Sequence, residues 1–375
     1  MSALIPGAFD RTLPTLAIDA HILDALTDGA WVAFNLSGGK DSGASAHAVN
    51  RLLDRMGHPR SHRIAIHADL GRAEWDMTPA TVEAIAAHIG VPLIVVRRSA
   101  GDMVARWEQR FANGKARYEA LETYNLIGPW SSSSLRFCTS ELKAQVIGPE
   151  LARRLRGQTI ISVIGLRRDE SQRRRNTPVS KVDARFAKPG NRHGTHMMLW
   201  HPLVDWTADD VFACHARGDI PLHDAYHVHG ATRLSCRFCV LASLHDLTVS
   251  AGVSANRDHY LHLVGMEATS TFSFQPARWL ADMAHDALPP DLSAAIELAK
   301  RHAMERRTLE AAMPRALRFV KGWPPRVPTL EEAGIIASAR APILVRHRLR
   351  NLYPTAAVVR DRFAELIALG RARDA

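Results

Sequence analysis

Short β-rich runs alternate with helical patterns over the first hundred residues of the chain. The apolar runs of strand length are residues 31–36, 63–68 and 91–96. Between them, residues 44–56 and 79–89 space their apolar positions as helices do. This alternation is typical of a parallel sheet whose strands are joined by crossover helices. Right-handed crossovers place the carboxyl ends of the three strands at one edge of the sheet.

The pattern is less regular in the middle of the chain and helical toward its end. Residues 112–140 show no clear period and are predicted to form a long loop. Residues 159–164 are a fourth strand, and the basic, glycine-containing residues 169–196 are predicted to form a flexible flap. A helix is expected over residues 208–216, and beyond about residue 275 the chain is mostly helical, with prolines at the breaks.

These patterns predict an α/β fold, with a twisted parallel sheet covered by helices on both faces and a mostly helical C-terminal region. The boundaries they indicate are an N-terminal extension over residues 1–27, a domain over residues 28–245 and an accessory region over residues 246–375. A chain of 375 residues suits two structural units, since a domain usually has roughly 100 to 200 residues.

Charge narrows the class of partner but does not select one. Lysine and arginine outnumber aspartate and glutamate by 48 to 38, and this formal charge of +10 attracts phosphate-rich molecules. ATP, tRNA and DNA are all polyanions, so each remains a candidate partner. The chain has no apolar run of about 20 residues and no basic segment followed by an apolar one at its N-terminus. We therefore expect no membrane span and a cytoplasmic location.

A glycine-rich loop lies between the first predicted strand and the first predicted helix. Its residues are Ser37, Gly38, Gly39, Lys40, Asp41 and Ser42. Unpaired N–H groups and the helix dipole converge at such a helix N-terminus, and adjacent glycines let an anion approach the backbone. Lys40 adds a mobile positive charge, and the serines add hydroxyl donors. The context favours a phosphate site over the alternative, a plain tight turn.

This loop resembles the Ser-Gly-Gly-x-Asp-Ser signature of the PP-loop ATP pyrophosphatases, which have the adenine nucleotide alpha hydrolase-like fold of HUP type. The resemblance implies that residues 37–42 hold the pyrophosphate end of ATP and that Asp41 binds Mg²⁺. It also implies cleavage between the α and β phosphates, with AMP transferred to an oxygen that later leaves. Lys40, Asp41 and Arg167 are the predicted catalytic residues.

Two further segments follow strands and are expected at the same sheet edge. Asp69, Gly71 and Glu74 resemble the Asp-Thr-Gly segment of adenosine phosphosulfate and phosphoadenosine phosphosulfate reductases, although Leu70 replaces the threonine. The resemblance implies that these three residues bind nucleotide. The alternative is a solvated turn.

The second segment begins at Gly165 and carries Arg167 and Arg168, resembling the Gly-x-Arg-x-x-Glu/Gln-Ser pattern of the same superfamily. An arginine fork suits a phosphate or sulfate group, so Gly165, Arg167 and Arg168 are predicted to face the nucleotide. The arginines at 173–175 are interpreted mainly as a solvated loop. Further matches at residues 205–211, 220–226 and 235–239 extend the resemblance over about residues 28–243.

Four cysteines are too few for a disulfide scaffold, so we consider for each of them which chemistry its spacing and neighbours indicate. Cys236 and Cys239 have a spacing used for iron–sulfur clusters, zinc and redox pairs alike. The segment around Cys138 resembles the one that donates cluster cysteines in the reductases and in the ATP pyrophosphatase of DNA phosphorothioation systems. Thr139 stands where the reductases have a second cysteine. The resemblance implies a 4Fe–4S cluster on Cys138, Cys236 and Cys239.

Three cysteines leave the fourth ligand of the cluster unassigned, and two alternatives concern this position. Cys214 lies in a predicted helix, where a buried packing role is favoured over a ligand role. Tetrahedral zinc, with His223, His227 or His229 as the fourth ligand, is the alternative to the cluster.

Three functions remain open from the sequence. The first, closest by resemblance to the phosphorothioation enzyme, is ATP-dependent activation of an oxygen for sulfur incorporation into nucleic acid. DNA is favoured over tRNA, with a sulfur donor and partner proteins. The second is a sulfonucleotide reductase, a class that uses a C-terminal nucleophilic cysteine, whereas this chain has no cysteine after Cys239. The third is a nucleotide-binding subunit without catalysis.

Overall fold

The computed structural model describes residues 13–234 and 236–374. The chain divides into two compact units. The first comprises the chain up to Met103 together with Arg136–Asn256, and the second comprises Val104–Leu135 together with the chain from Arg257 onward. The second unit is therefore built from two separate segments, one of which interrupts the first unit.

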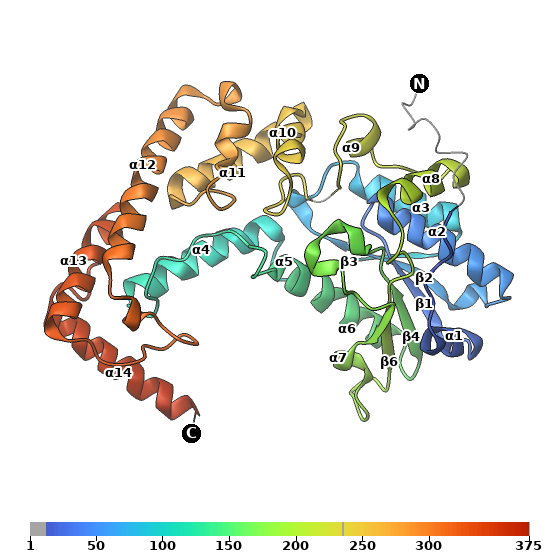
Figure 1. The fold of residues 1–375 in the computed structure, drawn as a ribbon, viewed down its shortest axis with the longest axis horizontal. Coiled ribbons are helices and arrows are strands. Elements are labelled where there is room, and N and C mark those ends of the chain that lie inside the picture. Colours follow the sequence, from blue (N-terminus) through green and yellow to red (C-terminus); the bar gives the residue numbers. More distant parts are fainter. Residues whose placement is uncertain (1–12, 235, 375) are drawn as a thin grey trace. The chain divides into compact units, whose positions relative to one another are not determined.

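The first unit contains a six-stranded sheet in the order β3-β2-β1-β4-β6-β5 (Figure 1). Its strands are β1 (Trp31–Asn35), β2 (Arg63–Asp69), β3 (Leu93–Arg97), β4 (Thr159–Val163), β5 (Ser180–Val182) and β6 (His196–Trp200). Neighbouring strands are parallel except for β5, which pairs antiparallel to β6 at the edge. The predicted α/β fold and its four predicted strands are confirmed.

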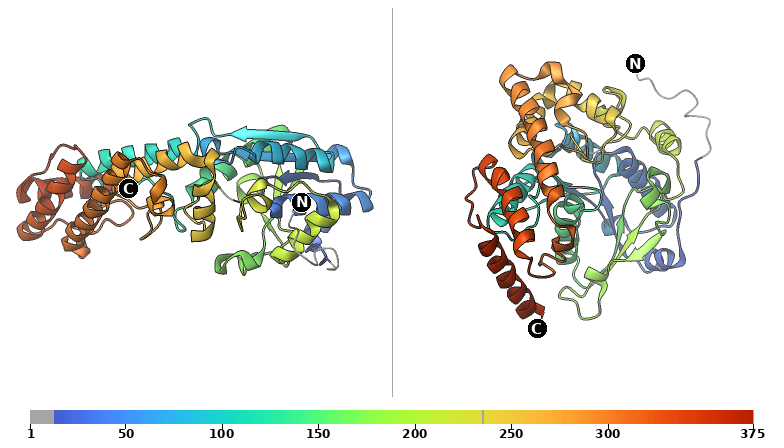
Figure 2. Two further views of the ribbon diagram at one scale, coloured as in Figure 1. Left: turned by 90° about the horizontal axis from the view of Figure 1, so that it is seen from above. Right: turned by 60° about the vertical axis from the view of Figure 1, so that its left-hand side comes forward.

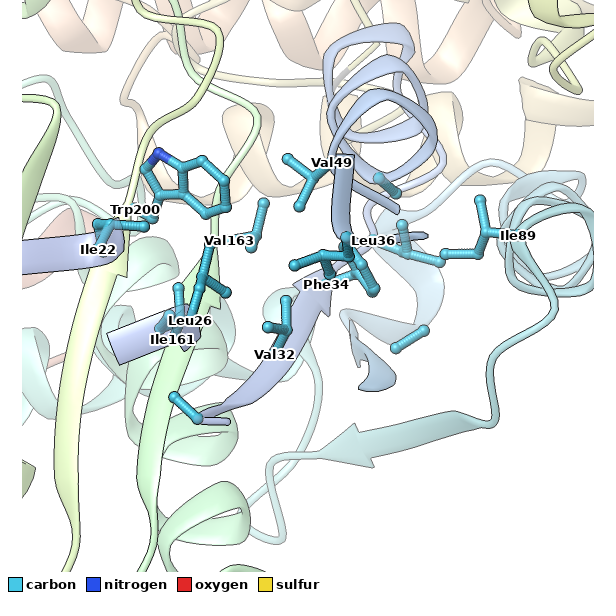
Figure 3. Packing of buried hydrophobic residues seen from close by; sticks show 14 of the residues in the cluster. Ile22, Leu26, Val32, Phe34, Leu36, Val49, Ile89, Ile161, Val163 and Trp200 are labelled. Carbon is cyan, nitrogen blue, oxygen red and sulfur yellow. The ribbon is translucent and has the colours of Figure 1, made fainter. Parts of the chain in front are cut away.

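Helices cover both faces of this sheet because alternate strand residues are apolar on each side. On one face, Val32 and Phe34 pack against α1 (Ala20–Thr27), α2 (Lys40–Arg55) and α3 (Thr78–Ile89), as Figure 3 shows. The remaining helices of the first unit are α5 (Phe137–Thr139), α6 (Gln145–Arg154), α7 (Ala184–Ala187), α8 (Ala208–Gly218), α9 (Asp224–His227) and α10 (Leu244–Gly252). On the opposite face, Ala33 of β1 packs in a cluster with Leu151 and Leu155, at the C-terminal end of α6.

Two parts of the chain differ from the sequence-based expectation. The predicted flap at residues 169–196 contains β5 and α7, and it leads directly into β6. The predicted loop at residues 112–140 begins inside a helix, α4 (Met103–Glu119). Asn113 and Gly114 resemble a helix break, but Gly114 sits where an added Cβ would lie 2.8 Å from the carbonyl oxygen of Ile127. The glycine therefore permits a close contact within a continuing helix.

The second unit is helical, as predicted for the C-terminal region. Besides α4 it contains α11 (Arg257–Ser270), α12 (Pro290–Ala312), α13 (Leu330–Arg346) and α14 (Ala356–Asp374), the yellow to red helices of Figure 2. Its core forms where Leu317 and Ile336 pack with Val359 and Phe363. None of the helices in the described part of the chain combines the length and the apolar character that a membrane span requires.

A buried carboxylate organises one loop of the second unit. Glu267, on α11, is fully buried. Its side chain accepts hydrogen bonds from the backbone N–H groups of Phe274 (2.7 Å), Leu280 (2.8 Å) and Ala281 (3.0 Å). Burial raises the pKa of Glu267 to about 7, even though the three donors favour the charged form. One side chain thus satisfies three buried backbone donors that would otherwise lack a partner.

Candidate functional site

The sheet order creates a crevice at the carboxyl ends of β1 and β4. Chain connections leave β1 toward β2 and β3 on one side, whereas β4 and β6 lie on the other side (Figure 1). In open α/β sheets, ligands bind at this reversal of strand order. The glycine-rich loop follows β1, and the arginine segment follows β4, which pairs with β1 through Phe34 and Val163. The topology therefore brings both predicted segments to one place.

The glycine-rich loop is shaped by one positive backbone angle, at Gly38, and by hydroxyl contacts. Gly38 has φ of 73°, a conformation that favours glycine. The N–H of Ser37 donates to the Ser42 hydroxyl (3.2 Å), and Gly39 caps α2 without any side-chain acceptor. A helix N-terminus whose N-cap residue has no side chain, beside a glycine turn, is a favourable place for a phosphate.

Lys40 is unusually buried for a lysine, with 4% of its side chain exposed. Its Nζ lies 3.3 Å from Asp41 Oδ2 and donates to the carbonyl oxygen of Thr232 (3.4 Å). The ammonium also lies over the rings of Phe212 and Tyr226, 5.6 Å and 5.2 Å from their centroids. Burial lowers the pKa of Lys40, so an anion placed beside it would be stabilised strongly.

Tyr226 and His215 hold the Lys40 backbone, and sequence reasoning missed both. The Tyr226 hydroxyl accepts hydrogen bonds from the N–H groups of Lys40 (3.2 Å) and Leu234 (3.0 Å). His215 Nε2 lies 2.7 Å from the Lys40 carbonyl oxygen. Tyr226 lies in a segment that matched the reductase pattern, but nothing in that pattern indicated which atom its hydroxyl contacts.

Arg167 joins the arginine segment to the loop. Its Nε donates to Asp41 Oδ1, its Nη1 contacts Asp169, and only 5% of its side chain is exposed. A Cβ added to Gly165 would lie 2.7 Å from the backbone nitrogen of Ser42, so only glycine allows the two segments to pack this closely. Arg168 points elsewhere, since it pairs with Asp205 and donates to the Thr177 carbonyl oxygen (3.0 Å).

Three more arginines enrich the positive charge around the crevice. Arg174 pairs with Glu170 and is 23% exposed. Burial, and then the charges of Arg233 and Arg136, lower the pKa of Arg174 to about 10. The buried Nε of Arg136 has no hydrogen-bond partner. Arg174 is thus more enclosed than a solvated loop residue, and neither Arg136 nor Arg233 was predicted from the sequence.

The predicted Asp69, Gly71 and Glu74 follow β2. Asp69 accepts a hydrogen bond from the Gly71 N–H (2.6 Å) and pairs with Arg97 on β3. Burial opposes ionisation, but the guanidinium of Arg97 lowers the pKa of Asp69. Gly71 has φ of 65°. Glu74 lies 3.3 Å from His67 Nε2, so it is connected to the strand rather than exposed as a free turn acid.

Cys138, Cys236 and Cys239 come from two segments that are far apart in sequence. Cys138 lies in α5, which continues into a π-helical turn, Ser140–Ala144, a feature frequent at functional sites. Burial raises the pKa of Cys236, and the nearby Cys239 and Cys138 raise it further. The Cys239 Sγ accepts a hydrogen bond from the Leu241 N–H (3.4 Å).

The cysteines do not form a ready metal site as they are placed. Within residues 13–234 and 236–374, no three His, Cys, Asp or Glu side chains are grouped closely enough to hold a metal ion. His223 uses both ring nitrogens, since Nδ1 accepts from the Ala225 N–H (3.0 Å) and Nε2 contacts the Thr78 hydroxyl (3.2 Å). Cys214 is buried in an apolar cluster with Leu203 and Val211, as its packing interpretation predicts.

The family of the chain follows from its sequence match. Residues 31–242, more than half of the chain, match the phosphoadenosine phosphosulfate reductase domain family. The chain belongs to this family. It thus carries a domain of the PP-loop and reductase-like superfamily, whose members are nucleotide-binding, sulfur-related enzymes. The matched span agrees with the resemblance found over about residues 28–243.

Two individual proteins are also similar. An uncharacterized 37.8 kDa protein in the gpa 5′ region of Escherichia phage 186 is 30% identical over 125 residues, which is 32% of this chain and 34% of that protein. The chain thus matches about a third of that curated relative's length. The crystal structure of phosphoadenylyl-sulfate reductase from Candida auris, a phosphate complex, superposes with a TM-score of 0.35 at 12% identity. That match covers 60% of this chain and 98% of the other.

Proposed function

We propose that the first unit is an ATP pyrophosphatase, which cleaves ATP into AMP and pyrophosphate and adenylates an oxygen to activate it for sulfur incorporation. The observation that carries the proposal is the joining of Lys40, Asp41 and Arg167 at the reversal of strand order. The complete Gly-Gly-Lys-Asp sequence between β1 and α2 supports a nucleotide with a free pyrophosphate end.

Each residue has a distinct part in this reaction. The N–H groups of the loop and the dipole of α2 would hold the β and γ phosphates. Lys40 and Arg167 would offset the charge that develops as pyrophosphate leaves. Asp41 is the residue that would bind Mg²⁺, because a carboxylate oxygen keeps acceptor capacity beyond its ion pairs with Lys40 and Arg167. Magnesium, when bound, would neutralise phosphate charge.

The competing activity is reduction of a sulfonucleotide, and one pair of assays separates the two. We expect purified protein to release pyrophosphate from ATP and to release no sulfite from adenosine phosphosulfate or its 3′-phosphorylated form. Both assays are run with and without DNA or tRNA, since the oxygen acceptor can limit turnover. Sulfite release without ATP cleavage would overturn the proposal in favour of a reductase. Tight ATP binding without any cleavage would indicate a non-catalytic nucleotide-binding subunit.

A 4Fe–4S cluster on Cys138, Cys236 and Cys239 is a separate proposal, with zinc as its alternative. The spacing of Cys236 and Cys239, and the influence of Cys138 on the pKa of Cys236, support it, but no catalytic step above depends on it. After anaerobic purification we expect iron and an absorption band near roughly 400 nm. Cys138→Ala should abolish the band, whereas Cys214→Ala, in the apolar cluster, should leave it. Iron-free protein, or equal loss in both variants, would rule out this ligand set.

Nucleic acid is the proposed partner, DNA before tRNA, with a sulfur-donor protein as a further partner. The second unit contains a 20-residue segment, 311–330, without any aspartate or glutamate. Its cations are all exposed: Arg315, Arg318, Lys321 and Arg326. Met313 and Leu317 of the same segment are buried, so packing in the core fixes the backbone that carries the basic side chains. This arrangement suits a phosphate backbone more than a small anion.

Neutralising this segment should weaken DNA binding in a salt-dependent manner. Each phosphate contact contributes about 0.9 to the slope of log affinity against log salt concentration. Replacing Arg315, Arg318 and Lys321 together with glutamine should therefore reduce that slope by about 2 to 3. The control replaces with glutamine three ion-paired cations of the same unit that lie outside the segment: Lys300, Arg346 and Arg350. Fluorescence anisotropy with labelled duplex DNA and tRNA measures the salt dependence of binding for both variants. Equal slopes for the two variants would contradict the proposal that segment 311–330 binds nucleic acid.

A further inference from the structure

His67 is a buried histidine on β2 that contacts the phosphate loop on one side. It is 4% exposed. Its Nδ1 lies 2.9 Å from the carbonyl oxygen of Leu36, the residue directly before Ser37. Because a carbonyl oxygen can only accept, Nδ1 is the donor in this hydrogen bond. The start of the glycine-rich loop is therefore fixed to the neighbouring strand by a side chain.

The other ring nitrogen of His67 contacts Glu74. Nε2 lies 3.3 Å from Glu74 Oε2, and the Glu74 side chain is 12% exposed. Burial opposes the charged ring, but the hydrogen bond and the charge of Glu74 raise the pKa of His67 above its ordinary value. Both contacts are hydrogen bonds at once only when both ring nitrogens carry a proton.

The segment that carries Glu74 is bonded in turn to the cysteine pair. Arg237 lies between Cys236 and Cys239, and its N–H donates to the Ala73 carbonyl oxygen (2.8 Å). The Arg237 guanidinium also donates to the Glu74 carbonyl oxygen and pairs with Asp76. Residues 73–76 are thus held by His67 on one side and by Arg237 on the other.

We propose that His67 is a positioning residue that couples the phosphate loop to the loop bearing Cys236 and Cys239. A continuous set of hydrogen bonds runs from Leu36 through His67 and Glu74 to Arg237, all within the first unit. A ligand that shifts the phosphate loop changes the geometry of the cysteine loop through these bonds, and the reverse holds by linkage. This inference rests on the proposed function only in taking ATP as that ligand.

Hydrogen exchange of backbone amides tests the coupling at both ends. In ligand-free protein, His67→Phe keeps the ring volume but removes both hydrogen bonds. We expect it to speed exchange about tenfold in peptides covering residues 36–42 and residues 236–242. His62→Phe is the matched control. His62 directly precedes β2 and contacts the carbonyl oxygen of Gly29, but it is hydrogen-bonded to neither loop. In wild-type protein, saturating ATP should slow exchange in both peptides.

Two conservative variants separate positioning from simple core packing. His67→Asn can still donate to the Leu36 carbonyl oxygen, so it should protect the phosphate loop alone. His67→Gln can reach Glu74, so it should protect the cysteine loop alone. If His67→Phe changes neither loop relative to His62→Phe, or if both amide variants behave like His67→Phe, the coupling is overturned. Failure of ATP to bind wild-type protein would instead refute the proposed function, while the ligand-free comparison still decides the role of His67.

Discussion

Lys40→Met should lower kcat for ATP cleavage by about 100- to 1000-fold while leaving the protein as stable as the wild type. The ammonium is almost fully buried beside Asp41 and two aromatic rings, so no water replaces its charge at the phosphates. Loss of one preorganised charge at a transition state costs on the order of 100- to 1000-fold in kcat. Burying the ammonium is itself unfavourable, as its lowered pKa indicates, and methionine fills a similar volume.

Pyrophosphate release gives kcat and KM, and thermal unfolding gives stability. Lys181→Met is the control, because Lys181 is an exposed lysine on β5 in the same unit. If Lys40→Met kept wild-type kcat with only a raised KM, Lys40 would contribute to ground-state binding alone. Equal loss of activity in both variants would remove Lys40 from the proposed catalytic group.

Glu267→Ala should destabilise the second unit more than any exposed substitution there. The change leaves three buried backbone N–H groups without an acceptor: those of Phe274, Leu280 and Ala281. Each orphaned donor costs roughly 1 to 3 kcal/mol, so the free energy of unfolding should fall by about 4 kcal/mol. Glu365→Ala, at an exposed position of α14, is the control. Chemical denaturation measures both variants.

The same carboxyl should make stability depend on pH. Its pKa is about 7 in the folded protein against an ordinary value of 4.5, so the folded state binds the proton more tightly. This contribution is complete below the ordinary pKa and is lost as pH rises through 7, with a total of about 3 kcal/mol. Glu267→Gln cannot titrate. The stability difference between wild type and Glu267→Gln should therefore shift by this amount between pH 4.5 and 8, and a constant difference would contradict the raised pKa.

Local patterns predicted the first four parallel strands because each carries a short apolar run next to a turn or helix signal. β6 was missed, since His196–Trp200 contains methionine, leucine and tryptophan but no β-branched residue. Its strand conformation comes from pairing with β4, where Ile161 lies opposite Met198. Such pairing is a tertiary effect that a local window does not contain.

The sequence points to candidate site residues where they belong to a consecutive motif, as in the loop at residues 37–42 and at Arg167. Arg136, Arg174 and Arg233 come from segments far apart in sequence, and only the fold brings their charges together. His67 did have a local signal. It stands two residues before Asp69 on one strand, so both side chains leave the same face of the sheet. The sequence does not show that the two ring nitrogens of His67 contact Leu36 and Glu74.

The interrupted first unit has a consequence for how the chain folds during synthesis. All of the sheet, the phosphate loop and the four cysteines have been made by residue 256, whereas α4 and residues 120–135 belong to a unit whose other helices come later. Trp107, Tyr118 and Trp130 are buried in the finished protein. Until α11 to α14 emerge from the ribosome, these aromatic side chains have no helices to pack against. They therefore remain exposed to solvent, where chaperones can bind them. A chain ending at residue 256 would leave these aromatic side chains exposed permanently. The C-terminal helices therefore also bury Val104–Leu135, the segment that interrupts the first unit and is synthesised much earlier.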